Sequence, residues 1–412
     1  MEAAPPDGGN APFRRLSRPT PAPSSHARDA ARPPPAPRVR LVRRQARDTR
    51  KDSPFKGGFV PGAVLNEGSV GATVYSPPHD DGTSSSGGVC LHVHGGGWIW
   101  GDSRDQVAHR CLETADVLVA HVVSVEYALF TKPSGDGCSF DPVNDVIVAL
   151  EWIEENHGKV LGAGPRFVAS GESAGAHLLM LAMLRRRDRA RAGEETEESA
   201  ASSSSRFPAE RSEPFDERWK CLNLVYGVFD LSGTPSVVTD GDSSVPLSGN
   251  DLLFMYDMYT SRMNERLEPD VVALTARDPS LSPMYADLSR LPSSLLTVGT
   301  ADALVDDTLY MATRLKSFGV DVDLAVYEGG EHGIGHFGAQ EDEEMGVEAR
   351  RYTLEYMKGR LWGNASRESQ NHWKTAMAKA AALTGPDRGK REIAQQSESR
   401  AKASGSIGGR NC

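Results

Sequence analysis

The chain reads Phe167-Val-Ala-Ser-Gly-Glu-Ser-Ala-Gly-Ala-His-Leu-Leu-Met180 where a short apolar run meets a second, helix-like apolar segment. Between the two, Ser173 is flanked by Gly171 and Gly175 in the pattern Gly-x-Ser-x-Gly. This pattern is typical of a nucleophile elbow, a sharp strand-to-helix turn that exposes a serine at the edge of a sheet. Glycine suits the flanking positions because strand and helix approach each other closely there. The sequence therefore predicts a reactive serine at position 173.

Apolar runs with strand character recur on both sides of this turn. They cover residues 70–75, 89–94, 117–125, 221–229, 294–299 and 322–327. Helix-like segments lie between several of them; one opens at Asp141-Pro142 and closes at Gly158, and another is capped by Asp307 and ends at Gly319. The alternation predicts an α/β fold, with a mostly parallel central sheet and helices on both faces.

The composition divides the chain into a large body and several polar segments. The 412 residues are 39% hydrophobic, enough to bury a sizeable core, and we expect one domain over residues 58–362. Residues 1–57 are rich in Pro and Arg, and we expect a disordered arm. An Arg/Glu/Ser-rich stretch predicts a disordered insertion over residues 185–218. Residues 246–283 are expected to form a partial cap, and residues 363–412 a polar, flexible tail.

Charge and cysteine content restrict the partners. The formal net charge of the chain is −10. Residues 1–57 carry a net charge of +8, so the remaining residues carry −18. An acidic body argues against nucleic acid, which needs a basic surface. Five scattered cysteines without a Cys-x-x-Cys pair favour a reducing compartment, with neither a disulfide framework nor a zinc site. No run is long enough for a membrane-spanning helix. We expect a cytoplasmic protein, or an organelle protein if the arginine-rich arm is a transit peptide.

A second glycine-rich segment, His94-Gly-Gly-Gly-Trp98, follows the strand expected over residues 89–94. Three consecutive glycines cost backbone entropy and contribute no packing. Their use indicates a loop whose N–H groups face a ligand closely, and an oxyanion is one such ligand.

With these motifs, the chain resembles the hormone-sensitive-lipase-like group of α/β-hydrolases, which are esterases and related acyl hydrolases. The similarity covers roughly residues 68–362. His94-Gly-Gly-Gly97 resembles the oxyanion loop of the group, and Gly171-Glu-Ser-Ala-Gly175 its nucleophile elbow. Gly299-Thr-Ala-Asp302 resembles its acid loop, and Glu331-His332-Gly333 its histidine turn.

The resemblance implies a catalytic triad in the order Ser, Asp, His along the chain. Ser173 is expected to attack the acyl carbon, His332 to transfer the proton, and Asp302 to orient the imidazole. The expected oxyanion hole consists of the backbone N–H groups of Gly96, Gly97 and Ala174. The implied protein is a serine esterase that forms an acyl-enzyme with small or short-acyl carboxylic esters, without a metal or other cofactor.

Several alternatives stay open from sequence. His336 competes with His332 as the base, although Gly333 and Gly335 argue against a helical pair of zinc ligands. The segment from Gly171 to His177 is also similar to kynurenine formamidases, which hydrolyse an aryl formamide. A third alternative is a non-catalytic small-molecule receptor on the same scaffold, as in the gibberellin receptors. Such receptors lack the catalytic histidine, so the presence of all three residues favours an enzyme.

Overall fold

The computed structural model describes residues 58–63, 70–77, 87–104, 107–131, 140–201, 214–240, 247–267, 271–336 and 343–363. For residues 58–63 and 194–201 only the backbone is described. All of these residues belong to one compact unit, Pro37–Cys412. The arm expected over residues 1–57, and all but the first residue of the tail expected over residues 363–412, lie outside the described residues.

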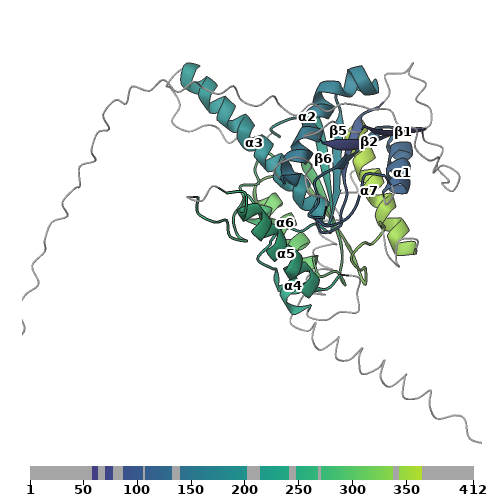
Figure 1. Cartoon of the computed structure of the whole chain (residues 1–412). Helices are drawn as coiled ribbons and strands as arrows, with labels where there is room; N and C mark the ends of the chain where they lie inside the picture. Colours follow the sequence, from purple (N-terminus) through teal and green to yellow (C-terminus); the bar gives the residue numbers. More distant parts are fainter. Residues whose placement is uncertain are drawn as a thin grey trace, which may run out of the picture. The chain divides into compact units, whose positions relative to one another are not determined.

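An eight-stranded sheet forms the centre of the described part (Figure 1), in the order β1-β2-β4-β3-β5-β6-β7-β8. The strands are β1 Gly58–Ala63, β2 Gly71–Ser76, β3 Val89–Val93, β4 His121–Glu126, β5 Phe167–Glu172, β6 Trp219–Val225, β7 Ser293–Gly299 and β8 Val322–Tyr327. β2 pairs antiparallel with β1 and β4, and the other neighbours are parallel. This confirms the α/β class with a mostly parallel sheet.

Helices cover both faces of this sheet (Figure 1). They are α1 Ala108–Leu118, α2 Pro142–Leu161, α3 Ala174–Ala201, α4 Pro235–Thr239, α5 Gly249–Asn264, the 3-10 helix η3 Pro283–Tyr285, α6 Val305–Ser317 and α7 Glu344–Trp362. Successive strand residues point to opposite faces, so Leu91 lies in the core beneath α2 and α3, whereas Cys90 lies in the core beneath α1 and α7. Burial on both faces explains why the strands read as continuous apolar runs.

The first helix, α1, is absent from the prediction. The strand expected over residues 117–125 begins only at His121, because Val117 and Leu118 form the last turn of α1. Val119 then ends the helix with a left-handed backbone at φ 51°. The buried side chains of this helix recur every three or four positions, at Ala108, Cys111, Leu112, Ala115 and Leu118. That helical period was the signal that could have identified α1.

The end expected for α2 is also wrong. The helix runs through Gly158 and stops at Leu161, and Gly162 follows with φ 64°. A glycine inside a helix costs about 1 kcal/mol relative to alanine but does not end it. The left-handed position after the last turn is the one that favours glycine.

The disordered insertion expected over residues 185–218 is wrong in its first part, because α3 continues to Ala201. Only 2% of Arg187 is exposed, and its guanidinium donates to the carbonyl oxygens of Asp287 and Ser289. Arg186 also pairs with Glu154 of α2, at 2.7 Å. These arginines anchor the helix, although the composition of residues 185–218 suggested a solvated chain. Residues 202–213 lie outside the described residues.

The start of α6 differs from the prediction as well. Asp307 does not cap this helix, which begins at Val305 without a side-chain cap. Its buried carboxylate instead accepts hydrogen bonds from the N–H groups of Phe229 and Asp230 and from the hydroxyl of Thr234. Asp307 therefore fastens α6 to the segment that follows β6.

Candidate active site

Ser173 lies on the sharp turn between β5 and α3, with a left-handed backbone at φ 52°. A Cβ atom added to Gly171 would lie 2.7 Å from the carbonyl oxygen of Gly175. One added to Gly175 would lie 2.1 Å from the carbonyl oxygen of Val93. The Ser173 N–H donates to the Val225 carbonyl at 2.9 Å, which ties the turn to β6. Both glycines of the motif are therefore needed for this turn to form.

Three predicted site residues form a hydrogen-bonded row. The Nε2 atom of His332 lies 3.1 Å from Ser173 Oγ, and its Nδ1 atom lies 2.9 Å from Asp302 Oδ2. The other oxygen of Asp302 accepts the Leu304 N–H at 2.8 Å, which fixes the carboxylate. All three side chains are buried. Because they follow β5, β7 and β8, the carboxyl ends of the parallel strands bring them to one edge of the sheet.

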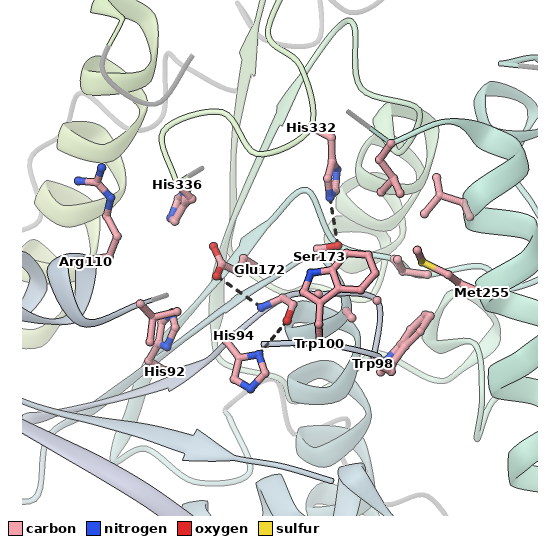
Figure 2. A pocket seen from close by; sticks show the side chains of 18 residues that line it. His92, His94, Trp98, Trp100, Arg110, Glu172, Ser173, Met255, His332 and His336 are labelled. Carbon is pink, nitrogen blue, oxygen red and sulfur yellow. Dashed lines mark hydrogen bonds between the residues drawn. The ribbon is translucent and has the colours of Figure 1, made fainter. Parts of the chain in front are cut away.

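Of the two histidines that the sequence left open, the structure brings His332 to Ser173. The Nδ1 atom of His336 lies 3.2 Å from the carbonyl oxygen of Ile334, in its own loop. Its ring packs edge-on against Tyr226, with 5.7 Å between ring centres. His336 lines the same cavity as Ser173, but on a different wall from the hydrogen-bonded row (Figure 2).

The glycine loop after β3 lies against the same cavity. Gly96 and Gly97 have φ values of 109° and 60°. A Cβ atom on Gly96 would lie 2.1 Å from the Trp100 carbonyl oxygen, and one on Gly97 would lie 2.6 Å from Met255 Sδ. Within the described part of the chain, the N–H groups of Gly96, Gly97 and Ala174 donate to no protein acceptor. The three residues line the cavity together with Ser173.

His94, as expected, and further side chains hold this loop. The Tyr127 hydroxyl donates to the His94 carbonyl at 2.9 Å, and the ring of Tyr127 stacks on that of His94. Burial lowers the pKa of His94, so its neutral ring donates from Nδ1 to the Gly95 carbonyl at 2.7 Å. Glu172 accepts the Gly95 N–H at 3.4 Å and the Tyr226 hydroxyl at 3.3 Å. Two of these residues had a sequence signal: His94 opens the glycine motif and was expected to hold this loop, and Glu172 lies inside the serine motif.

The cavity around Ser173 has a volume of about 410 Å³ and two chemically different ends (Figure 2). Its apolar end is lined by Trp98, Val228, Leu247, Leu252 and Met255. Three of these come from residues 246–283, where a partial cap was expected. Its polar end is lined by His92, Arg110, Glu172 and His336.

The described ranges also bear on metal binding and on membrane insertion. Within them, no cluster of three or more His, Cys, Asp or Glu side chains is arranged to hold a metal ion. None of the helices in those ranges combines the length and the hydropathy needed to cross a bilayer.

Comparison with known proteins gives consistent matches. A family model described as "alpha/beta hydrolase fold" matches residues 90–336, which contain Ser173, Asp302 and His332. Ethyl acetate hydrolase of Pseudomonas putida is 27% identical over 291 residues, covering 68% of this chain and 78% of that protein. Bovine arylacetamide deacetylase is 27% identical over 279 residues, covering 59% and 67% respectively. An esterase from Pyrobaculum calidifontis superposes with a TM-score of 0.54 at 27% identity, covering 74% of this chain and 84% of that one.

Proposed function

Since this chain belongs to the family of proteins with the α/β-hydrolase fold, we propose that it is a serine esterase that cleaves small carboxylic esters. The observation that carries the proposal is the row of Ser173, His332 and Asp302, with hydrogen-bond distances of 3.1 and 2.9 Å. A nucleophile, a base and a group that orients the base are the three parts that such a reaction needs.

Acylation begins when Ser173 Oγ attacks the ester carbonyl carbon. The hydroxyl proton moves to His332 Nε2, because a serine hydroxyl is a weak nucleophile at neutral pH. Asp302 accepts from Nδ1–H and stabilises the imidazolium that forms. The new oxyanion receives hydrogen bonds from the N–H groups of Gly96, Gly97 and Ala174. The bond to the leaving oxygen then breaks, and His332 gives its proton to the departing alcohol.

Deacylation repeats these steps with water. His332 removes a proton from a water molecule as its oxygen attacks the acyl carbon of the ester formed with Ser173. The same three N–H groups hold the second oxyanion. When the bond to Ser173 Oγ breaks, His332 returns the proton to the serine, and the carboxylic acid leaves. The enzyme is regenerated without any cofactor.

The cavity supports small substrates. Its volume of about 410 Å³ lies near the lower end of ligand pockets, which run from about 300 to 1,000 Å³. Met255 lies against Gly97 and lines the apolar end. A relative named ethyl acetate hydrolase supports the same size range for this chain. No observation favours the formamidase or receptor alternatives over the esterase, since His332 is in place and the matched proteins include named esterases.

The test is hydrolysis of p-nitrophenyl esters with acetyl, butyryl and palmitoyl chains. We expect kcat/KM to be highest for the two short chains. Ser173→Ala should lower kcat by about four to six orders of magnitude, because the triad acts as a unit. Ser317→Ala, at the exposed end of α6, is the control and should keep wild-type activity. Turnover retained by Ser173→Ala would contradict the proposal.

A further inference from the structure

Apart from Glu172, which also holds the glycine loop, the side chains at the polar end of the active-site cavity take no part in the proposed reaction. His92, Arg110, Glu172 and His336 lie on one side of Ser173, whereas Trp98 and Met255 lie on the other (Figure 2). Three of the four polar residues also line a second cavity of about 30 Å³. A pocket meant for alkyl groups alone has no reason to place charged groups beside its nucleophile, because desolvating them is costly.

Two arginines near the polar end contact the same carboxylate, that of Glu113. Arg110, on α1, is held by Glu113, with 2.9 Å between Nη1 and Oε2, and its side chain is 11% exposed. Arg350, on α7, places its Nε 3.7 Å from the same carboxylate oxygen. Glu113 thus lies between two guanidinium groups and fixes their positions.

The negative charge nearest the nucleophile belongs to Glu172. Both hydrogen bonds that it accepts from the described residues are long, at 3.3 and 3.4 Å, although the residue is only 8% exposed. Burial by itself raises the pKa of Glu172, but the ring of His336 and the Gly95 N–H are among the groups that hold that pKa below its usual value. Glu172 is therefore an ionised, weakly satisfied acceptor on the cavity wall.

His92 and Asn223 add hydrogen-bonding capacity without charge at neutral pH. Burial lowers the pKa of His92 to about 4, so its ring is neutral. Asn223, which is 1% exposed, lines the second cavity and donates from Nδ2 to Ser170 at 3.0 Å. Its Oδ1 accepts no hydrogen bond from the described residues. The second cavity is large enough for about one water molecule or one terminal hydroxyl.

The ligand class follows from this balance of charge. Arg110 and Arg350 offset Glu113 and Glu172, so a carboxylate or an ammonium would add an unbalanced charge in a poorly solvated place. An alkyl group would displace water from the charged groups without replacing its hydrogen bonds. A hydroxyl both donates and accepts, and it can meet an acceptor such as Glu172 and a donor such as Arg110.

We infer that the polar end formed by His92, Arg110, Glu172 and His336 is a subsite for a hydroxylated part of the substrate. The preferred substrates are then esters that carry a free hydroxyl, such as partial esters of polyols. This inference rests on the proposed esterase function and specifies its substrate class.

The test uses ester pairs that differ by a methyl group replaced by a hydroxyl. Propyl acetate and 2-hydroxyethyl acetate form the alcohol-side pair, and ethyl butanoate and ethyl 3-hydroxypropanoate form the acyl-side pair. In at least one pair, we expect kcat/KM to be about tenfold or more higher for the hydroxylated ester, because hydrogen bonds to charged groups are among the stronger ones. Ethyl hydrogen malonate and carboxymethyl acetate, the charged counterparts, should be poorer substrates than the hydroxylated esters.

The outcomes separate the two claims. Turnover of these esters without a hydroxyl preference would overturn the subsite while leaving the esterase function intact. A preference for the carboxylate-bearing esters would overturn the choice of a neutral ligand. If none of the esters and no p-nitrophenyl ester were cleaved, the esterase function would fail and the subsite with it.

Variants at the two ends of the cavity provide the control. Arg110→Met should lower the ratio of kcat/KM for the hydroxylated ester to that for its alkyl partner by about tenfold. Arg110→Lys, which keeps the charge, should restore part of that ratio. Met255→Leu, at the apolar end, should leave the ratio within about twofold, since such swaps nearly conserve volume. An unchanged ratio in a folded Arg110→Met protein would contradict the inference.

Discussion

Ser173 becomes a nucleophile through its surroundings, since an isolated serine hydroxyl scarcely ionises at neutral pH. The left-handed φ of 52° turns the hydroxyl toward the cavity and carries a backbone strain of about 1–3 kcal/mol. The hydrogen bond from the Ser173 N–H to Val225, and the first turn of α3, hold the residue in that conformation. His332 then lies within hydrogen-bond reach of the serine oxygen.

At the same scale, the two histidines of the loop after β8 should behave differently. His332→Gln should lower kcat about as far as Ser173→Ala, because glutamine cannot shuttle the proton. His336→Gln should cost at most about tenfold on a neutral p-nitrophenyl ester, since its Nδ1 contacts the Ile334 carbonyl oxygen in its own loop and not Ser173. Steady-state kinetics of the two variants, compared at equal folded concentration, check this. An active His332→Gln beside an inactive His336→Gln would reverse the assignment of the base.

At the scale of elements, the C-terminal part of α3 is held in place by a buried arginine. Arg187 donates to the loop before β7 through the carbonyl oxygens of Asp287 and Ser289. Arg189, two residues on, is 61% exposed in its side chain and pairs loosely with Glu151 at 3.6 Å. One helix thus offers a buried and an exposed arginine for comparison.

The buried arginine should matter far more to stability. Arg187→Ala should lower the free energy of unfolding by about 2–4 kcal/mol, because two carbonyl groups lose a charged donor. Arg189→Ala should change it by less than about 0.5 kcal/mol, as expected for an exposed ion pair. Urea denaturation followed by circular dichroism measures both. Equal effects in the two variants would show that α3 is not anchored through Arg187.

The contact between Asp307 of α6 and the segment that follows β6 should depend on pH. Burial raises the pKa of Asp307 to about 7, and the donors of Phe229, Asp230 and Thr234 offset that rise only in part. In the unfolded chain an aspartate titrates near pH 4, about its ordinary value. The folded protein therefore keeps a proton that the unfolded chain releases. The stabilisation from this proton is complete below about pH 4 and is lost as the pH rises through about 7.

Asp307→Asn, which stays neutral, is the reference for this effect. Between pH 5 and pH 8, the wild type should lose about 2–3 kcal/mol of unfolding free energy relative to the variant. Urea denaturation of both proteins at the two pH values gives the difference, and other titrating groups cancel in the comparison. A difference that does not vary with pH, or that grows in favour of the wild type at pH 8, would refute the raised pKa.

At the scale of the whole molecule, the sequence predicted what local patterns encode. The strands before Ser173, Asp302 and His332 are continuous apolar runs. The mostly parallel sheet, and the place of the site residues directly after its strands, could therefore be inferred. The polar end of the cavity could not be inferred, because Arg110 lies on α1, which was not predicted. Arg110 shares its partner Glu113 with Arg350, and Glu113 and Arg350 are 237 positions apart in the sequence. Contacts of this kind depend on which helices share a face of the sheet, and that is decided by packing.

Residues 1–57 lie outside the described residues, and their composition still predicts an arm that packs little. Removing them should leave kcat/KM for p-nitrophenyl butyrate and the melting temperature nearly unchanged. Removal through residue 76 is the control, because it deletes β2, whose buried Tyr75 donates to the Ser103 carbonyl at 2.7 Å. That shorter protein should not fold. A drop of many degrees on removing residues 1–57 alone would show that the arm packs against the body.

The central claim is that Ser173 is the one activated serine, and a covalent organophosphate probes it most directly. Diethyl p-nitrophenyl phosphate transfers its diethylphosphoryl group to an activated serine oxygen and releases p-nitrophenolate, so the adduct marks the nucleophile. Mass spectrometry of the intact protein and of its peptides should find one such group per chain, on Ser173, with esterase activity lost in proportion. His332→Gln should remain almost unlabelled over the same period. An adduct on a different serine, or full inhibition with Ser173 unmodified, would contradict the account.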